Sequence, residues 1–208
     1  MKAVVYIRTM EAMDHRQRRQ LGQQWLYHAV ADYGHPEVTM ENCPMVRTDK
    51  GKPFFATDPG VHFSISHSKE YWACVVSDGP VGLDLQYHKQ GRLEQIPPRF
   101  FHPQEVAWLE KQASPSAFFE IWTAKESYVK WTGDGIDRHF KAFAVADTTG
   151  LRETMGDAYF WRGVIGNDYS LCLCGGQPWD AVRIMKMEED KIVPWPLCGA
   201  TDGIDQDI

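Results

Sequence analysis

The sequence predicts an α+β protein of two pseudo-symmetric halves, each a small, mainly antiparallel sheet packed with a long helix. Two segments with helical periodicity, residues 11–31 and 114–135, are each accompanied by short runs rich in β-branched and aromatic residues. The second half thus repeats the helix-then-strands order of the first, although no repeat of the residues themselves establishes a duplication. With 208 residues, 43% of them hydrophobic, the chain is long enough for two such halves around a shared core.

The first half, residues 1–81, is predicted to start with a short apolar strand at residues 3–7. Residues 11–31 then place apolar side chains at the spacing of one buried stripe, which predicts an amphipathic helix. After a polar passage containing several prolines, three short strands joined by turn residues are expected at residues 61–66, 71–78 and 80–86. We expect these three strands to form one antiparallel sheet.

The second half, residues 82–187, is predicted to contain two helices at residues 102–112 and 114–135. The later helix has a proline near its start and Gly133 at its end, which are typical helix boundaries. Four strands with Gly- and Asp-containing turns are expected after it, at residues 139–147, 158–166, 169–176 and 181–187. The tail, residues 188–208, has no usable periodicity and is expected to pack loosely.

The composition argues against two classes of partner. A net charge of −6 and a pI near 5.7 do not suit a nucleic-acid-binding protein, which needs a concentrated basic face. No apolar run approaches the ~20 residues of a membrane span, and the N-terminal run is too short for a signal peptide. Five cysteines without a C-x-x-C spacing suit reduced thiols. We therefore expect a cytoplasmic protein without nucleic-acid or membrane partners.

One carboxylate, Asp84, stands in the otherwise apolar run "PVGLDLQ". A second acid, Glu126, lies on a predicted helix four residues before Lys130, so the two side chains share one helix face. Acids from a strand and a helix can converge on a hard cation such as Mg²⁺, which keeps coordination positions for phosphate oxygens. The alternatives are a buried turn acid for Asp84 and a surface ion pair for Glu126 and Lys130.

Three other polar segments each allow two interpretations. His67 ends an apolar strand in "SISHS" and is either a structural hydrogen-bonding residue or a ligand contact. Lys52, in "GKP", is by itself a lysine in a turn. The basic cluster Arg16, Arg18 and Arg19 is either a solvated helix face or a local contact for a polyanionic ligand.

Taken in this order, "GKP", "FSISHS", "VGLDLQ", "FFHPQE" and "WTAKESYVK" resemble the motifs of the larger, surfactin-synthetase-activating type of 4′-phosphopantetheinyl transferase. The resemblance runs from about residue 51 to residue 135. Members of that family move phosphopantetheine from coenzyme A to a serine of an apo acyl or peptidyl carrier protein, use Mg²⁺ or Mn²⁺, and release adenosine 3′,5′-bisphosphate. The resemblance implies this fold and activity, and a monomer, because a chain with two halves can form the site internally.

The resemblance also implies catalytic roles for four residues. Asp84 and Glu126 match the metal-binding acids of the family, and Lys130 matches the lysine that faces the pyrophosphate. Glu105, in "HPQE", matches a glutamate proposed as the general base for the carrier serine. Glu105, Glu126 and Lys130 are thus the expected catalytic residues, with a metal-bound water as the alternative base.

A second set of residues is expected to bind coenzyme A. His67 matches the histidine that meets the 3′-phosphate, Ser66 stands beside it in the same motif, and Lys52 matches a lysine lining the nucleotide site. Arg16 and Arg19 fall where the family places basic side chains near the 3′-phosphate.

The sequence departs from the family pattern at Gln86, where many bacterial members have a second acid two residues after the aspartate. Strand alternation places Asp84 and Gln86 on one face, so Gln86 is expected to offer an amide oxygen to the metal, or to a metal-bound water, but no charge. A non-catalytic module that binds coenzyme A or a carrier protein is therefore one alternative function. A metal-dependent phosphodiesterase is another, although the chain lacks the His and Asp clusters that two metals need.

Overall fold

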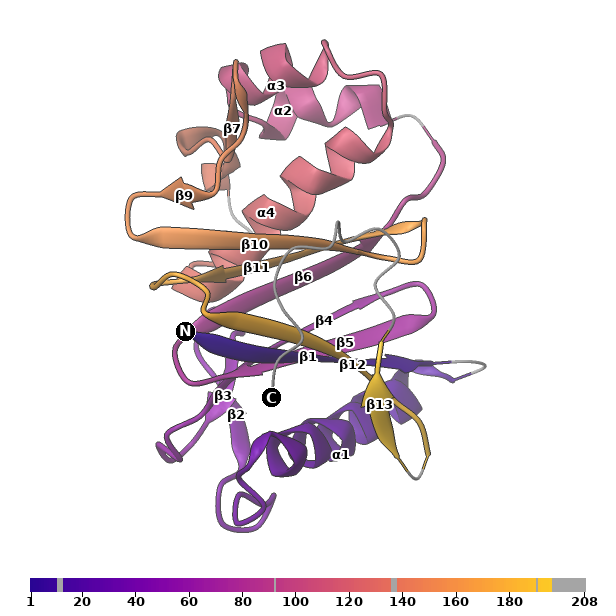
Figure 1. The fold of residues 1–208 in the computed structure, drawn as a ribbon, viewed down its shortest axis with the longest axis vertical. Helices are drawn as coiled ribbons and strands as arrows, with labels where there is room; N and C mark the ends of the chain where they lie inside the picture. The colour runs from indigo at the N-terminus through magenta and orange to yellow at the C-terminus, as the bar shows by residue number, and fades with distance from the viewer. Residues whose placement is uncertain (11–12, 92, 136–137, 190, 196–208) are drawn as a thin grey trace, which may run out of the picture.

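The computed structural model of this chain describes residues 1–10, 13–91, 93–135, 138–189 and 191–195. Two β-sheets pack against each other, and each carries one long helix on its outer face (Figure 1). Helix α1 (His15–Tyr33) covers the first sheet and helix α4 (Ser116–Thr132) covers the second. The order of layers is therefore helix, sheet, sheet, helix, and the predicted α+β class is confirmed.

The first sheet has the strand order β13-β12-β1-β5-β4. Its strands are β13 (Ile192–Pro194), β12 (Ala181–Met187), β1 (Lys2–Thr9), β5 (Tyr71–Ser77) and β4 (His62–Ser68). Strand β12 runs parallel to β1, and the other pairs are antiparallel. Helix α1 starts with a capping box between Asp14 and Gln17 and ends at Gly34, whose φ of 123° favours glycine.

The second sheet is antiparallel and has the order β6-β11-β10-β9. Its strands are β6 (Val81–Tyr87), β11 (Tyr169–Gly175), β10 (Ala158–Ile165) and β9 (Thr154–Met155). Two short hairpins join β2 (Met45–Arg47) to β3 (Pro53–Phe55) and β7 (Ala146–Asp147) to β8 (Gly150–Leu151). The short helices are η1 (Leu93–Gln95), α2 (Pro97–Phe100), α3 (Pro103–Leu109) and η2 (Arg138–Ala142).

Three apolar clusters fill the spaces between these layers. Tyr6 and Cys74 of the first sheet pack with Leu26 and neighbouring residues of α1. The opposite face of the first sheet meets Leu83, Leu171 and other residues of the second sheet. The outer face of the second sheet packs under Ile121 and neighbouring side chains of α4. Because side chains alternate across a strand, each central strand is buried on both faces.

Four predicted segments differ from the structure in their position or conformation. The strand at residues 80–86 pairs with β11 of the second sheet instead of joining β4 and β5. The strand at residues 181–187 pairs with β1, because the apolar β1 is buried on both faces and needs a neighbour at each edge. Residues 192–194, predicted to lack regular structure, form the edge strand β13. Residues 138–142 form a 3₁₀ turn instead of the start of a strand at 139–147.

The 3₁₀ turn at residues 138–142 has a local cause. The carbonyl oxygens of Phe140 and Phe143 both accept hydrogen bonds from Nζ of Lys125, at 2.6 and 2.7 Å. These carbonyls are therefore turned toward a buried ammonium group and are not available to a strand ladder. The expected start of the first helix at residues 11–12 and the tail beyond residue 195 lie outside the residues that the structure describes.

Three serines of β4 join the two sheets at their common edge. The backbone N–H groups of Leu83, Leu85 and Tyr87 in β6 donate to the hydroxyls of Ser64, Ser66 and Ser68, at 3.0, 3.3 and 2.9 Å. All three serines are buried. The hydroxyls thus take the place of a backbone partner for the free edge of β6, and they hold β4 beside it.

We expect Ser64→Ala to destabilise the protein by about 1–3 kcal/mol, because the buried N–H of Leu83 loses its acceptor. Urea unfolding followed by circular dichroism measures this loss. Ser114→Ala provides the contrast, because that hydroxyl is exposed and bonds only to Ser116 at the start of α4, so its substitution should lower the midpoint much less. An equal midpoint for Ser64→Ala and the control would contradict the role of the serine hydroxyls.

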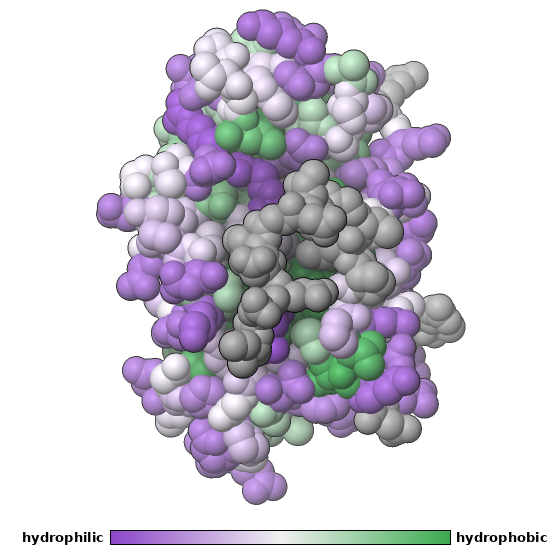
Figure 2. Space-filling view, in the orientation of Figure 1, coloured by the Kyte–Doolittle hydropathy of each residue, from purple (hydrophilic) through white to green (hydrophobic). Residues whose placement is uncertain are grey.

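Figure 2 shows one face of the molecule. Where grey atoms do not cover this face, it is mostly hydrophilic, and its hydrophobic residues lie in small separate patches. Within the part of the chain that the structure describes, no helix is both long enough and apolar enough to span a membrane.

Candidate functional site

Strand β6 and helix α4 approach each other closely, and glycine makes this possible. A Cβ atom at Gly82 would overlap the carbonyl oxygen of Ser127 and the backbone nitrogen of Trp131, both in α4. The helix backbone therefore lies directly on β6, with no side chain of residue 82 between them. This contact places the next outward-facing residue of β6, Asp84, beside Glu126 and Lys130.

Asp84 is held by two partners through one of its oxygens. Oδ1 of Asp84 lies 2.7 Å from Nζ of Lys130 and accepts a hydrogen bond from the Ser66 hydroxyl at 2.8 Å. The same hydroxyl accepts hydrogen bonds from Lys130 at 3.0 Å and from the N–H of Leu85. Ser66 therefore uses its donor and both acceptor positions, and it ties β4, β6 and α4 together at one point.

The two carboxylates of the site are buried. Asp84 is 6% exposed and Glu126 is 5% exposed. Burial raises the pKa of Glu126 to about 7; the charge of Asp84 adds to this rise, and Lys130 offsets part of it. Glu126 thus lies buried beside a second carboxylate, and a cation bound by both would offset their repulsion.

A divalent metal ion fits the oxygens that this site offers. Oδ2 of Asp84 is buried and has no hydrogen-bond partner within the described part of the chain. Hard cations such as Mg²⁺ prefer carboxylate oxygens, so Asp84 and Glu126 are the residues that would hold one. No group of three or more His, Cys, Asp or Glu side chains that could hold a metal gathers anywhere among the described residues, this site included. The protein's charged ligands at this site are therefore two.

Gln86 follows Asp84 on the same face of β6 and is half-buried. Its amide nitrogen donates to the carbonyl oxygen of Tyr87 at 3.2 Å. The neighbouring position on β11 is Ser170, whose hydroxyl lies 2.8 Å from Nε2 of His88. Gln86 thus follows Asp84 on one face of β6 and places a neutral amide there.

Glu105 lies in a different environment from the one expected of a general base. Its side chain has no exposed surface and forms an ion pair of 2.9 Å with Lys125, which is also fully buried. Its two oxygens also accept the N–H groups of Val145 and His102, each at 2.7 Å. A base must reach the proton that it removes, and this closed network does not favour the general-base role expected for Glu105.

The Glu105–Lys125 pair holds three segments together. Lys125 belongs to α4, Glu105 to α3, and the carbonyls that Lys125 also binds belong to the 3₁₀ turn and the residues after it. Burial raises the pKa of Glu105 and lowers that of Lys125 to about 8, while their mutual attraction acts against both shifts. The pair positions α4, one residue before Glu126, from the side opposite to Ser66 and Asp84.

We expect Lys125→Met to destabilise the protein by about 3–5 kcal/mol, because it leaves the carboxylate of Glu105 buried without a counter-charge. The double variant Glu105→Gln/Lys125→Met should recover part of this loss, since no unpaired charge then remains buried. Urea unfolding curves of the two single variants and the double variant measure the coupling. If the two single effects simply add in the double variant, the two residues do not act as a pair.

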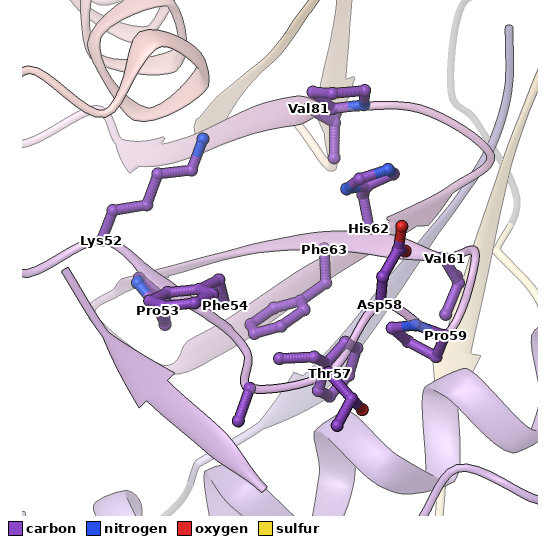
Figure 3. A pocket seen from close by; sticks show the side chains of 13 residues that line it. Lys52, Pro53, Phe54, Thr57, Asp58, Pro59, Val61, His62, Phe63 and Val81 are labelled. Carbon is purple, nitrogen blue, oxygen red and sulfur yellow. The ribbon is translucent and has the colours of Figure 1, made fainter. Parts of the chain in front are cut away.

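Lys52 lies at the C-terminal end of helix α4. Its Nζ donates to the carbonyl oxygen of Trp131 at 2.7 Å, and burial lowers its pKa. It also borders a pocket of ≈ 380 Å³ between the β3–β4 connection and the start of β6 (Figure 3). The lining is mostly apolar, with a few polar groups: residues 52–59, 61–63, 80 and 81. A pocket of this size and character can take a small organic ligand.

His67 and Ser66 point to opposite faces of β4, as neighbours on a strand must. His67 pairs with Trp72 of β5, on the face covered by α1, and Gly22 of α1 packs over the ring of Trp72. The exposed Arg16 and Arg19 lie on the turns of α1 just before Gly22. His67 and these arginines therefore belong to one region, separate from the buried carboxylates.

The structure thus brings together Ser66, Asp84, Glu126 and Lys130, and Gln86 follows Asp84 on the same face of β6. The positioning roles of Ser66 and of the Glu105–Lys125 pair were missed by sequence reasoning. Ser64, Ser66 and Ser68 alternate with other residues along one strand, and this period of two is the signal that points to a shared face.

Comparisons with known proteins show which family this chain resembles. Residues 80–174 match the profile of the 4′-phosphopantetheinyl transferase superfamily. The chain is 41% identical over 102 residues to the 4′-phosphopantetheinyl transferase gsp of Aneurinibacillus migulanus, covering 48% of this chain and 42% of that protein. It is 35% identical over 150 residues to a 4′-phosphopantetheinyl transferase of Bacillus subtilis, covering 67% of this chain and 66% of that protein.

A third relative, the 4′-phosphopantetheinyl transferase Sfp of Bacillus subtilis (strain 168), is 28% identical over 137 residues, or 62% of this chain and 61% of that protein. The matched part of the chain therefore spans between 42% and 66% of the length of these three relatives. The profile match contains β6, α4 and β11, and with them Asp84, Glu126 and Lys130.

Proposed function

Because this chain belongs to the 4′-phosphopantetheinyl transferase superfamily, we propose that it transfers the 4′-phosphopantetheine group of coenzyme A to a serine of an apo acyl or peptidyl carrier protein. Adenosine 3′,5′-bisphosphate is the second product. One observation carries this proposal: Asp84, Glu126 and Lys130 meet in one buried site between β6 and α4. The arrangement suits a substrate that brings both a metal ion and a pyrophosphate.

The proposed reaction replaces the phosphoanhydride bond of coenzyme A with a phosphodiester bond to the carrier serine. The serine oxygen of the carrier attacks the β-phosphorus of the pyrophosphate, and the bond from that phosphorus to the bridging oxygen breaks in line. Lys130 binds the pyrophosphate and offsets the negative charge that grows on the leaving oxygen. Asp84 and Glu126 hold Mg²⁺ or Mn²⁺, with Gln86 offering an amide oxygen. When bound, the ion supplies positive charge to the same phosphates.

The serine proton needs an acceptor at the site. Glu105 is buried in its pair with Lys125, so we assign the proton to Glu126 or to water beside it. Ser66 acts as a positioning residue, because its hydroxyl contacts both Asp84 and Lys130. In this proposal, Glu105 supports the helix instead of acting as the general base. Ser66 orients the site instead of binding coenzyme A.

The remaining basic residues would bind the rest of coenzyme A. Lys52 borders the apolar pocket, which we assign to the nucleotide, while His67, Arg16 and Arg19 offer positive charge to the 3′-phosphate. These groups give an acidic protein a local basic region for a polyanionic ligand. We further propose that the protein is cytoplasmic. We also propose that it is a monomer, because the two sheets supply both sides of the site from one chain.

Mass spectrometry of a carrier protein tests the proposed activity. The protein is incubated with coenzyme A, Mg²⁺ and several apo carrier proteins, and a phosphopantetheine adduct on a carrier serine is the expected result. Absence of an adduct on every carrier would reject the transferase. Binding of coenzyme A without any turnover would then favour a non-catalytic module, and loss of coenzyme A without modification of the carrier would favour a phosphodiesterase.

Gln86→Glu is expected to keep transferase activity and to bind Mn²⁺ more tightly, because it adds a third carboxylate beside Asp84 and Glu126. The free Mn²⁺ signal in electron paramagnetic resonance measures the affinity, and the adduct assay measures activity. Gln104→Glu is a control that adds the same charge at the exposed start of α3. Equal Mn²⁺ affinity in Gln86→Glu and in the unmodified protein would show that residue 86 lies outside the metal site.

A further inference from the structure

Lys130 occupies one side of the carboxylate that would bind the metal. Its Nζ lies 2.7 Å from Oδ1 of Asp84 and 3.0 Å from the hydroxyl of Ser66, so both groups fix the ammonium at this oxygen. The other oxygen, Oδ2, is buried and has no hydrogen-bond partner among the described residues. The ammonium group of Lys130 therefore offsets the negative charge of Asp84 before any ligand binds.

The charges of the site decide how easily a metal ion can join this arrangement. The charged group in contact with the two carboxylates is Lys130, because Gln86 is neutral and the charge of Lys125 is matched by Glu105. Cys172 and then Arg162 continue the row of Asp84 across β11 and β10, and Arg162 adds a further positive charge to that row. A divalent ion beside two carboxylates and one ammonium leaves an excess of positive charge. Asp84 and Glu126 are almost fully buried, so water can screen little of that excess.

We propose that Lys130 makes binding of the divalent metal at Asp84 conditional on a diphosphate ligand. The inference rests on the proposed function, which supplies the diphosphate of coenzyme A. The negative oxygens of a diphosphate balance both the ammonium and the metal ion, so the excess positive charge disappears when all three are present. Lys130 is 28% exposed, and its flexible stem allows it to reach a ligand at the mouth of the site.

The coupling is reciprocal. If coenzyme A raises the affinity of the site for the metal by some factor, then the metal raises the affinity for coenzyme A by the same factor. The replacement of an acid by Gln86 strengthens this dependence, because a third carboxylate would balance the metal without any help from the substrate. Lys130 thus acts as a positioning residue that orders assembly of the site, besides its contact with the pyrophosphate.

Mn²⁺ titrations without and with coenzyme A test the inference, using the free Mn²⁺ signal in electron paramagnetic resonance. Lys130→Met should bind Mn²⁺ alone at least about tenfold more tightly than the unmodified protein, since it removes a positive charge next to a buried ion. Lys130→Arg keeps the charge and should stay weak. Lys186→Met removes one positive charge from the distant strand β12, so it controls for net charge and should also stay weak.

Saturating coenzyme A should raise the Mn²⁺ affinity of the unmodified protein at least about tenfold, and that of Lys130→Met by much less. Titration of coenzyme A with Mn²⁺ alone corrects for their direct association. Asp84→Asn should abolish the bound Mn²⁺ in every background, which assigns the signal to this site. Thermal melting confirms that each variant is folded.

Two results would overturn the inference. One is equal or weaker Mn²⁺ binding by Lys130→Met in the absence of coenzyme A, and the other is bound Mn²⁺ that persists in Asp84→Asn. Neither result depends on transfer to a carrier protein. A protein that forms the carrier adduct but shows no effect of Lys130 on Mn²⁺ would keep the proposed function and lose the coupling.

Discussion

Glu126→Gln is expected to abolish phosphopantetheine transfer and to leave the fold intact. The glutamine keeps the size of the side chain but removes the charge that would hold the metal ion. Because the metal supplies several kcal/mol of charge stabilisation to such a reaction, the rate should fall by roughly a thousandfold or more. The fold should not suffer, since burial and the neighbouring Asp84 already disfavour the charged form of Glu126 and raise its pKa to about 7.

The carrier adduct assay and thermal melting measure these two outcomes separately. Glu120→Gln is a matched control, because Glu120 lies on the same helix, is only half-buried and contacts Ser116 rather than the site. The control should keep its activity. Full activity in Glu126→Gln would show that the metal assignment is wrong, and a large drop in melting temperature would show that the carboxylate has a structural role instead.

Gly82→Ala is expected to destabilise the protein by about 3 kcal/mol or more and to remove activity. The added methyl group would overlap two backbone atoms of α4, in Ser127 and Trp131, and a backbone cannot rotate away as a side chain can. The helix must then move off β6. That movement separates Lys130 from Asp84, which lie 2.7 Å apart in the intact site.

Urea unfolding measures the loss of stability in Gly82→Ala. Gly22→Ala in α1 provides the contrast: its new methyl group would lie 3.3 Å from the ring nitrogen of Trp72, and alanine favours a helix by about 1 kcal/mol over glycine. This control should therefore change stability much less. Equal midpoints for the two variants would contradict the close approach of α4 to β6.

The ordered motifs predicted the family correctly, and three residues that they single out, Asp84, Glu126 and Lys130, lie together in the structure. Glu126 and Lys130 could be placed on one face because helical spacing is a local property of the sequence. Their meeting with Asp84 depended on the resemblance, because no local pattern shows which strand a helix covers. Tertiary packing, through Gly82, provides that information.

Glu105 and Glu126 show why residue type alone was not enough. Both are glutamates close to aromatic residues, yet Glu105 is enclosed by Lys125 and two backbone N–H groups, whereas Glu126 faces Asp84. The difference depends on Lys125, which sits next to Glu126 in the sequence but turns to the other side of the helix. A sequence does not show which of two neighbouring charges has been neutralised by a distant residue.

The predicted neighbours of two strands were wrong for a related reason. The period of two identified strands β6 and β12 correctly, but it did not identify their neighbours. Strand β12 joins the first sheet because β1 is buried on both faces, and β6 leaves that sheet because serine hydroxyls satisfy its edge. Both outcomes depend on contacts between residues that are far apart in the chain.

The position of β1 in the middle of the first sheet affects how the chain can fold during translation. Lys2 pairs with Ala181, so β1 leaves the ribosome long before its parallel neighbour β12 is made. At about 5–20 residues per second, the apolar edge of β1 waits for roughly ten seconds or longer. During that time the nascent chain presents an unpaired strand, which is a natural target for chaperones at the ribosome exit and a point where slow synthesis would favour aggregation.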